Sequence, residues 1–252
     1  MADTNATSDV VHASEPAFID NRLLATFPME LRQSLRDRIE IVRLKAGDVV
    51  LRRGTDVDSS IFPFGPTMIS MIVNLGEGRS VEVASIGREG AVGGIVSCGH
   101  APAFARAEAI VGGPVARLPM RVIEDAKASS GHLRNLFCRY SDYLLSQIMQ
   151  SAACNSFHTI EQRAARWLLT AQDRAGDQLA LTQEALAGLL GVQRTSINAA
   201  ARQLTDEGLI TTRRGTIAVI DRARLEARAC ECRDRVERFF GDMVGEGGLG
   251  RP

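Results

Sequence analysis

The sequence lacks the features of membrane and secreted proteins. No run of apolar residues approaches the roughly 18 that a membrane-spanning helix needs. The first stretch, MADTNATSDVVHASEPA, has no basic segment and no apolar segment, so it does not predict a signal peptide. The five cysteines are odd in number and show no disulfide-like spacing, which favours a reducing compartment. We therefore expect a cytoplasmic protein with no membrane partner.

The chain also has no net charge at neutral pH. The 252-residue chain carries 30 basic and 30 acidic side chains. Because the protein is not basic overall, any surface that binds nucleic acid must be local. The chain is 45% hydrophobic and 24% charged, so it can bury a core, and its length fits one large or two ordinary domains.

Motifs of catalysis and of metal binding are scarce. We find no nucleophile elbow, phosphate loop or paired-carboxylate site, so we expect no enzyme. An iron–sulfur sensor needs clustered cysteines, and none lie near the N-terminus. The pair Cys230-x-Cys232 is a thiol switch, half a metal site or two ordinary cysteines, and the last interpretation is favoured. The histidines, which lack metal-ligand spacing, are His12, His100, His132 and His158. We expect no metal and no cofactor.

The order of patterns predicts an α+β protein. Residues 1–17 are small and polar and predict a disordered N-terminus. A helix is expected over 21–40. Short β-branched runs then alternate with glycine turns over 41–118, as is typical of an antiparallel β-roll or sandwich. A short helix should begin near Pro119, so the β domain is expected to cover 18–128.

A long amphipathic helix is expected over 129–155. Its apolar stripe fits either one side of a domain core or the seam of a dimer, and the dimer interpretation is favoured. Asn155 and Ser156 break the pattern and predict a hinge, which leaves 156–252 for a second domain. The residues expected at the dimer interface are Leu133, Leu136, Phe137, Tyr140, Leu144 and Ile148.

The stretch LTQEALAGLLGVQRTSINAAARQLTDEGLI predicts a helix–turn–helix. Thr182 can begin the first helix, and Gly191 can end it in the left-handed conformation. The second helix is expected over about 194–207, with Ile197 and Leu204 on its buried face. The opposite face carries short side chains, which allow a helix backbone to approach the major groove of DNA.

The next stretch, LITTRRGTIAVID, predicts two strands joined at Arg213, Arg214 and Gly215, a wing tipped by two guanidinium groups. Between Arg194 and Arg224 there are six arginines and three acids, a net charge of +3 that suits phosphate contact. A solvated helical hairpin is the alternative, but helix, turn, helix and wing together favour DNA binding. The residues expected to contact DNA are Thr182, Gln193, Arg194, Thr195, Ser196, Asn198, Ala199, Arg202, Arg213 and Arg214.

These segments resemble the Crp/Fnr family, the cyclic-AMP-receptor-protein type of bacterial transcription regulator. The helix–turn–helix stretch is similar to the family's winged-helix signature. The segment LKAGDVVLRRGTDVDSSIFPFGPTMISMIVNLGEGRSVEVASIGREGAVGG resembles its cyclic-nucleotide-binding β-roll, and RRGTIAVIDRARLEARACEC resembles a subgroup. The resemblance covers about residues 20–240. It implies a homodimer paired through the long helix, a palindromic operator on double-stranded DNA, and contact with RNA polymerase.

The resemblance also implies how bases are read. Arg194 matches the family's base-reading arginine, which suits guanine O6 and N7. Thr195 and Ala199 stand where relatives often carry Glu and Arg, so we expect an altered operator with a thymine near these methyl groups. The positions expected to contact phosphates are Gln193, Ser196 and Arg202.

The resemblance argues against cyclic AMP as the ligand. Relatives that bind it place a Glu after a Gly to accept the ribose hydroxyl, whereas this chain has Gly93-Gly94. Arg106-Ala107 is the nearest candidate for the cyclic phosphate, and Ile148 stands about where polar residues meet the adenine. Each lost buried hydrogen bond costs about 1–3 kcal/mol. The candidate pocket residues are Arg79, Arg88, Glu89, Gly93, Gly94, Arg106 and Ala107. The alternative function is a regulator gated by a thiol or by an unidentified small molecule.

Overall fold

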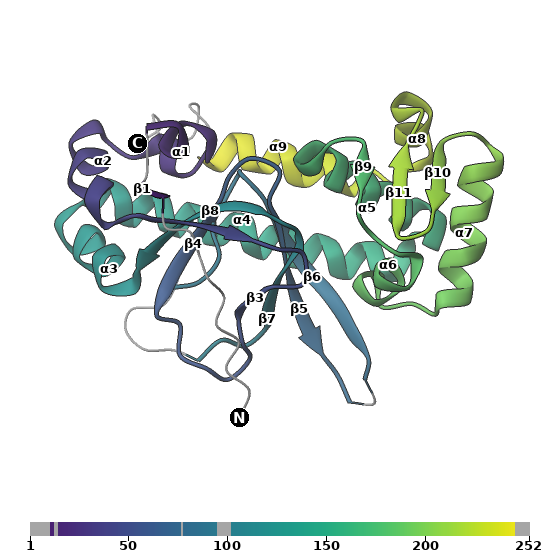
Figure 1. Ribbon diagram of the computed structural model, residues 1–252, viewed down its shortest axis with the longest axis horizontal. Helices are drawn as coiled ribbons and strands as arrows, with labels where there is room; N and C mark the ends of the chain where they lie inside the picture. Colours follow the sequence, from purple (N-terminus) through teal and green to yellow (C-terminus); the bar gives the residue numbers. More distant parts are fainter. Residues whose placement is uncertain (1–10, 13–14, 77, 95–101, 245–252) are drawn as a thin grey trace.

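The computed structural model describes residues 11–12, 15–76, 78–94 and 102–244 (Figure 1). At its N-terminal end, strand β1 (Val11–His12) pairs with the first strand of the β domain, and helix α1 (Glu15–Asp20) follows. The expectation of disorder through residue 17 is therefore wrong for these residues. Residues 1–10 and 13–14 lie outside the described part of the chain.

The helix expected over 21–40 is interrupted. Its place is taken by η1 (Leu24–Thr26), α2 (Met29–Leu35) and η2 (Arg36–Arg38). Pro28 explains the interruption, because proline has no N–H to donate and disfavours helical backbone at the preceding residue. Phe27 is accordingly extended (φ −69°, ψ 137°), and Pro28 becomes the N-cap of α2. The sequence pattern placed the apolar residues correctly but missed this break.

Two four-stranded antiparallel sheets form the N-terminal β-roll, as predicted. Their orders are β1-β2-β8-β4 and β3-β7-β5-β6. The strands are β2 (Glu40–Leu44), β3 (Val49–Leu51), β4 (Ser59–Pro63), β5 (Met68–Asn74), β6 (Ser80–Ile86), β7 (Arg106–Val111) and β8 (Gly113–Pro119). Buried apolar side chains from both sheets, Ile61 and Ile69 among them, form one cluster.

Helix α3 (Met120–Ser129) begins directly after Pro119, as predicted, and α4 (Gly131–Phe157) is the expected long helix. The hinge predicted at Asn155 and Ser156 is wrong, because α4 continues through both residues. The break comes at His158, the C-cap of α4. Thr159 then starts α5 (Ile160–Ala175) with a capping box, in which its hydroxyl accepts from Gln162 N and the Gln162 side chain accepts from Thr159 N.

The first half of α4 is buried within its own chain. Leu133, Leu136, Phe137 and Tyr140 are at most 1% exposed and belong to the core shared with α3 and the β-roll. They therefore have no surface to offer a second chain, which corrects their expected place in a dimer interface. Of the expected set, Leu144 is half-buried against this core, and only Ile148 is exposed.

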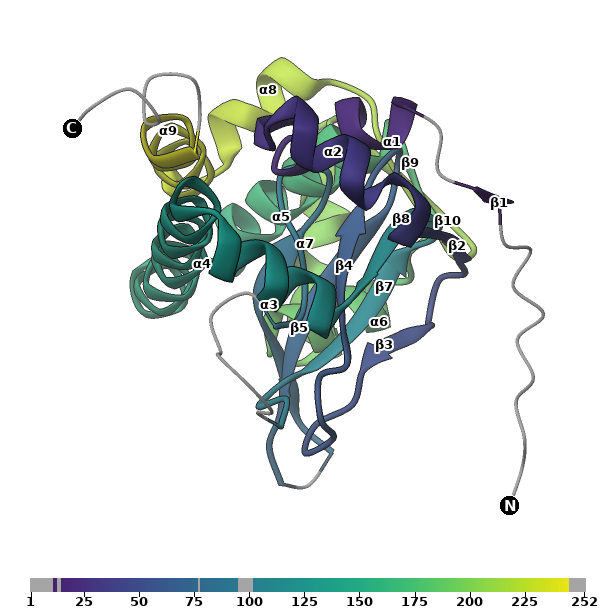
Figure 2. The same cartoon turned by 90° about the vertical axis from the view of Figure 1, so that its left-hand side faces the viewer.

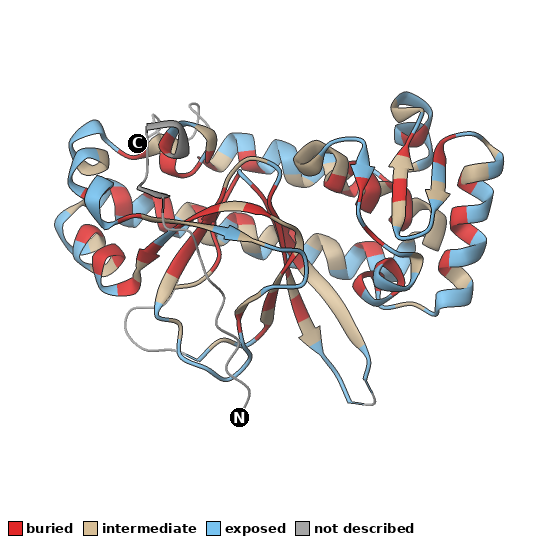
Figure 3. Cartoon of the chain, viewed as in Figure 1, coloured by how far each residue is buried: buried red, intermediate tan, exposed pale blue. Residues whose placement is uncertain are grey.

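The C-terminal domain has the predicted order of elements. It comprises α5, β9 (Gln178–Leu179), α6 (Gln183–Leu190), α7 (Arg194–Asp206), β10 (Ile210–Arg213), β11 (Thr216–Val219) and α8 (Arg222–Arg228). The hairpin β10–β11 gains β9 as a third strand, which the sequence pattern did not predict. Trp167, Ile197 and Leu204 are buried in one cluster around which the helices pack (Figure 3).

The last helix, α9 (Cys232–Val244), leaves this domain and lies along α4 (Figures 1 and 2). Its Phe240 ring packs against Tyr143 at a centroid distance of 4.8 Å, and Phe240 and Val244 join the N-terminal core. The single domain expected over 156–252 therefore ends before α9.

The two domains also pack directly on each other. Trp167 Nε1 of α5 donates to Glu82 Oε1 of β6 at 3.0 Å, and Met68 and Ile72 of β5 belong to the same buried cluster as the helices of the C-terminal domain. Among the described residues, no helix has both the length and the apolar character to cross a membrane.

Candidate nucleic-acid interface

The turn between α6 and α7 is fixed by local hydrogen bonds. The Thr182 hydroxyl caps α6 by accepting from Ala185 N at 3.0 Å. Gly191 ends α6 in the left-handed region (φ 64°, ψ 36°), where a glycine has no steric penalty. Val192 N then donates to Ala187 O at 3.0 Å and closes the turn. This geometry directs α7 across α6, at the outer edge of the molecule (Figure 1).

Helix α7 separates into two faces. Ile197, Ala201 and Leu204 are buried, as the spacing predicted, together with Ala200. The outward positions are Gln193, Arg194, Thr195, Asn198, Ala199 and Arg202, which are exposed, and Ser196, which is half-buried. A backbone flanked by such short side chains can lie close to base edges.

The N-terminus of α7 is available to an anion. Its N-cap, Gln193, makes no side-chain capping hydrogen bond in the described part of the chain. The first turn of a helix has N–H groups without intrahelical acceptors, and the helix dipole adds positive potential there. Those two properties make the start of α7 suited to a phosphate oxygen.

Among the residues that the structure describes, two arginines of α7 make only weak ion pairs. Arg194 Nη1 lies 3.5 Å from Glu184 Oε2, and these side chains are 66% and 75% exposed. Arg202 Nε lies 3.8 Å from Asp206 Oδ2, at a similar exposure. Exposed pairs of this kind contribute about 0–1 kcal/mol, so either guanidinium can exchange its carboxylate for a nucleic-acid acceptor.

The wing adds two more exposed guanidinium groups. Arg213 pairs with Thr216 at the end of the hairpin, and Arg213 and Arg214 are both exposed. Arg222, by contrast, points back into the domain, where its Nη1 lies 2.8 Å from Asp173 Oδ1. The local positive charge is therefore concentrated on α7 and the wing tip.

Comparison with known proteins identifies this part of the chain. The model of the Crp-like helix-turn-helix domain matches residues 162–228. These residues form a Crp-like helix-turn-helix domain. A comparison with curated proteins gave no match.

Solved structures extend the likeness beyond the Crp-like domain. FixK2 from Bradyrhizobium japonicum superposes with a TM-score of 0.64 at 16% identity, over 76% of this chain and 98% of FixK2. The c-di-GMP-responsive regulator CLP of Xanthomonas campestris gives 0.61 at 16%, over 76% and 99%. TTHB099, a CRP-family regulator from Thermus thermophilus, gives 0.62 at 20%, over 74% and 95%. The chain has the fold of Crp/Fnr regulators, with N-terminal β sheets followed by the Crp-like domain.

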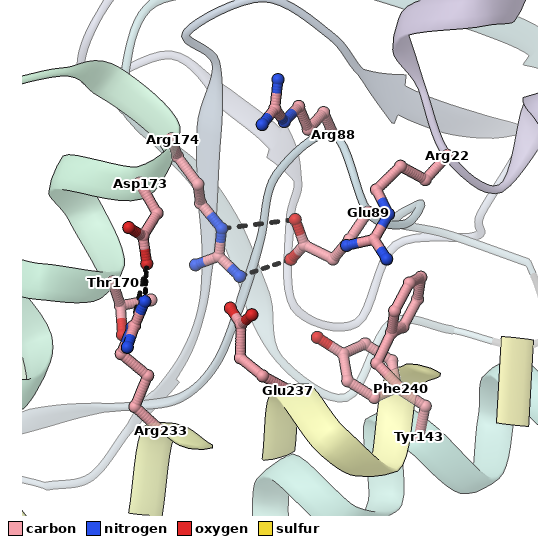
Figure 4. Close-up of a pocket in the computed structure, with 10 residues that line it drawn as sticks. All are labelled: Arg22, Arg88, Glu89, Tyr143, Thr170, Asp173, Arg174, Arg233, Glu237 and Phe240. Atoms are coloured by element: carbon pink, nitrogen blue, oxygen red, sulfur yellow. Dashed lines mark hydrogen bonds and ion pairs between the residues drawn. The ribbon is translucent and has the colours of Figure 1, made fainter. Parts of the chain in front are cut away.

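Two of the residues expected in a ligand pocket line a cavity of about 270 Å³ between the β-roll and the Crp-like domain (Figure 4). These are Arg88 and Glu89. Most of its lining is charged and comes from α5 and α9, which sequence reasoning did not connect with a pocket. The full lining is Arg22, Arg88, Glu89, Tyr143, Thr170, Asp173, Arg174, Arg233, Glu237 and Phe240.

A buried ion pair crosses this cavity. Arg174 of α5 binds the Glu89 carboxylate through both Nε and Nη2, and each side chain is 10% exposed (Figure 4). Arg174 Nη1 also donates to Ser85 Oγ at 2.7 Å. Burial lowers the pKa of Arg174, but the Glu89 carboxylate outweighs it, and the net shift is upward. The guanidinium is therefore charged and held against the β-roll.

The other expected pocket residues lie elsewhere. Arg106 Nη2 is 3.1 Å from Glu108 Oε2 on the same strand, and Ala107 is fully buried. Arg79 stands near the tip of the β5–β6 hairpin, where its backbone N–H and carbonyl bond the hairpin itself. A Cβ on Gly94 would lie 1.9 Å from Met120 Sδ, which is the far end of a flexible side chain and can move aside. A Cβ on Gly93 would lie 2.6 Å from the backbone oxygen of Ser59, so this position has no room for a side chain.

A cluster of thiols was missed by the sequence analysis. Cys154 and His158, at the end of α4, lie beside Cys230 and Cys232, although His158 was expected to have no metal-ligand spacing. The pKa of Cys154 is lowered by a hydrogen bond from Cys230, and the pKa of Cys230 is raised by the same bond and by burial. Burial also raises the pKa of Cys232. The i, i+4 spacing of Cys154 and His158 was the available signal, but nothing in the sequence joined it to the distant pair.

Proposed function

We propose that this protein is a homodimeric, sequence-specific transcription regulator that reads a palindromic operator with α7 and acts together with RNA polymerase. The observation that carries the proposal is the exposed face of α7. Its short side chains, its open N-terminus and the adjacent Arg-tipped wing form one surface on the Crp-like domain. Helix, wing and local positive charge together suit a major groove flanked by phosphates.

The base contacts follow from the first turns of α7. Arg194 can donate two hydrogen bonds to guanine O6 and N7. Thr195 and Ala199 offer methyl groups, which favour a nearby thymine. We propose that Gln193, Ser196 and Arg202 hold the phosphates on either side. The operator then differs from that of relatives with Glu and Arg at positions 195 and 199.

We assign the dimer contact to the second half of α4. Leu145, Ile148 and Met149 are 53%, 40% and 62% exposed and follow each other at helical spacing. The neighbouring face of α4, with Tyr143 and Cys154, is already covered by α9 and the thiol cluster. Large exposed apolar groups on one helix face mark an interaction surface. A two-fold axis along this face would have to set the two α7 helices about 34 Å apart.

Cyclic AMP is a poor candidate for the signal. The space between the sheets holds a cluster of buried apolar side chains, Leu51 and Ile86 among them. Gly94 stands where relatives place the ribose-binding carboxylate, and it has no side chain to accept a hydrogen bond from the ribose. Arg106, the nearest candidate for the phosphate, is paired with Glu108.

The test is selection of DNA sites from a random pool with the full-length protein, followed by affinity measurements on the selected site. A palindrome containing a guanine in each half is expected. Arg194→Ala should lower specific affinity by about 1–3 kcal/mol for each half-site and leave nonspecific binding nearly unchanged. Arg224→Ala is the matched control, since Arg224 is exposed in the same domain but lies off this surface beside Asp221. Equal loss in both variants, or selection of the ordinary family consensus, would contradict the assignment.

A second candidate function adds gating by an anionic small molecule at the cavity between the domains. The observation that favours it is the number of guanidinium groups facing one cavity, among them Arg88 and Arg22. A structural neighbour is described as c-di-GMP-responsive, which makes that dinucleotide a suitable probe beside cyclic AMP. Binding should raise the melting temperature and change operator affinity, and Arg88→Ala should remove both effects. If neither nucleotide changes the melting temperature or the operator affinity, neither of them is the ligand of this cavity.

Gating by a thiol is tested separately. If oxidation of the cysteines controls DNA binding, operator affinity should differ between reduced and oxidised protein. The difference should disappear when Cys230 and Cys232 are both replaced by Ser. Equal operator affinities with and without reductant would exclude control of DNA binding by thiol oxidation.

A further inference from the structure

Four potential metal ligands converge where the long helix meets the start of α9. Cys154 Sγ and Cys230 Sγ lie 3.5 Å apart, and Cys232 Sγ lies 3.5 Å from His158 Nδ1. All four ligand atoms lie within 4.8 Å of one another. The three cysteines are 0%, 6% and 1% exposed, and together they form a buried cluster.

Two local features of the backbone present these side chains to one point. Cys154 and His158 are four residues apart, so they project from the same face at the end of α4. His158 N donates to Cys154 O at 3.1 Å, which keeps His158 on the last turn. Cys230 lies in the break between α8 and α9, after the extended backbone at Ala229 (φ −76°, ψ 158°), and Cys232 is the first residue of α9.

The distances fit a tetrahedral metal site. With Zn–S bonds of about 2.3 Å, the edges of a tetrahedron of sulfur ligands are about 3.7 Å long. The Cys154–Cys230 sulfur distance of 3.5 Å is close to this value, and the Cys232 Sγ–His158 Nδ1 distance of 3.5 Å suits the shorter edge expected with a Zn–N bond of about 2.0–2.1 Å. A disulfide needs sulfurs about 2.05 Å apart and would engage only two of the four groups. The geometry therefore favours a shared ion over a covalent pair.

A second layer of contacts orients the ligands. His158 directs Nδ1 at the cluster, while its Nε2 lies 3.3 Å from Glu231 Oε2. A histidine that binds a metal through one nitrogen usually donates from the other to a carboxylate or carbonyl. Gln150 Nε2 donates to Cys232 Sγ at 3.1 Å, which supports the charge of a thiolate.

The surrounding charge also suits a set of three thiolates and one imidazole. Bound to a divalent ion, this set carries a net charge of −1. The Arg166 guanidinium interacts with Cys154 as a nearby positive charge. Arg163, 7% exposed, interacts in the same way with Cys154 and Cys230. Two cations beside a buried anionic site reduce the cost of burying it.

We propose that Cys154, His158, Cys230 and Cys232 bind one Zn²⁺ as a closed structural site. Sulfur and nitrogen ligands in a tetrahedron select zinc among the common divalent ions. Four protein ligands leave no open position, which distinguishes this site from a catalytic one. The ion connects the last turn of α4 to the segment between α8 and α9.

The test begins with the metal content of the full-length protein. After purification without chelator from zinc-containing medium, elemental analysis should give about one zinc per chain. Cobalt added to the metal-free, reduced protein should give the strong visible bands of tetrahedral Co²⁺ and a thiolate charge-transfer band. Absence of both the zinc and this spectrum would overturn the proposal.

Substitutions connect the ion to these ligands. The Cys230→Ser protein should lose most of its zinc. Cys138 is an exposed cysteine of α4, the helix that carries Cys154, and the Cys138→Ser protein should retain its zinc. His158→Cys should keep the ion as a four-thiolate site, which covers the case in which Cys230→Ser does not fold. Glu231→Gln should weaken zinc binding about 10–100-fold in competition with a chromophoric chelator. Equal zinc loss in Cys138→Ser and Cys230→Ser, or a Cys154–Cys230 disulfide in mass spectra of the freshly isolated protein, would refute the site.

Discussion

Breaking the buried ion pair between Glu89 and Arg174 should strongly destabilise the protein where its two domains meet. Glu89→Gln removes one charge while keeping the shape of the side chain and an oxygen that can accept from Gly87 N. The guanidinium of Arg174 would remain, 10% exposed, with Ser85 as its main partner. Removing one partner of a buried pair costs about 3–5 kcal/mol, because the other charge stays uncompensated.

Urea unfolding measures this cost, and the chain has a built-in reporter. Trp167 is the single tryptophan, and its indole donates to Glu82 across the domain interface. With a slope of about 1–3 kcal/mol per molar urea, the midpoint of the Trp167 fluorescence transition should fall by at least about 1 M. Asp206→Asn, which breaks the exposed pair with Arg202, is the control and should cost under about 1 kcal/mol. If Glu89→Gln shifts the midpoint no more than this control, the pair does not hold the domains together.

Two further predictions concern the β-roll. Burial raises the pKa of Glu82, so the folded protein binds the carboxyl proton more tightly than the unfolded chain does. The protonated carboxyl group therefore favours the folded state. This contribution to stability is complete below the ordinary pKa of 4.5 and is lost as the pH rises through the raised pKa. Glu82→Gln should therefore stabilise the protein at pH 7, by a margin that shrinks toward acid pH in thermal unfolding, and a margin independent of pH would contradict this account. Gly93→Ala should cost at least about 1–3 kcal/mol, because its Cβ would lie 2.6 Å from the backbone oxygen of Ser59. Gly47→Ala, also at positive φ but with nothing within 4 Å of the added Cβ, should cost less, and equal losses would show that backbone strain alone is responsible.

The Crp-like domain could be predicted closely because its signals are local. Thr182, Gly191 and the spacing of Ile197 and Leu204 each determine the backbone within one or two turns. The start of α7 at Arg194 was therefore placed correctly, and its end was placed one residue late. The same reasoning failed over 21–40, where the apolar period was given more weight than Pro28.

What could not be predicted depends on contacts between distant segments. The apolar stripe of α4 has the same spacing whether a residue faces its own core, as Phe137 does, or solvent, as Leu145 does. Whether a residue of α4 faces the core or solvent is decided by where the β-roll and α9 pack against the helix. The meeting of His158 with Cys232 likewise requires the whole Crp-like domain to return the chain to the end of α4.

The return of α9 to α4 changes how the Crp-like domain is attached. The chain enters this domain at His158 and leaves it near Cys230, and Cys154 and Cys230 show that the two crossings lie side by side. The domain is thus inserted between the N-terminal half and α9, and its two connections lie at nearly one point. Two adjacent connections hold the domain against separation and free rotation more firmly than one would, and the buried cluster that it shares with Met68 and Ile72 adds to this. If the Glu89–Arg174 contact were broken, the two adjacent crossings would still limit how far α7 could move relative to the β-roll.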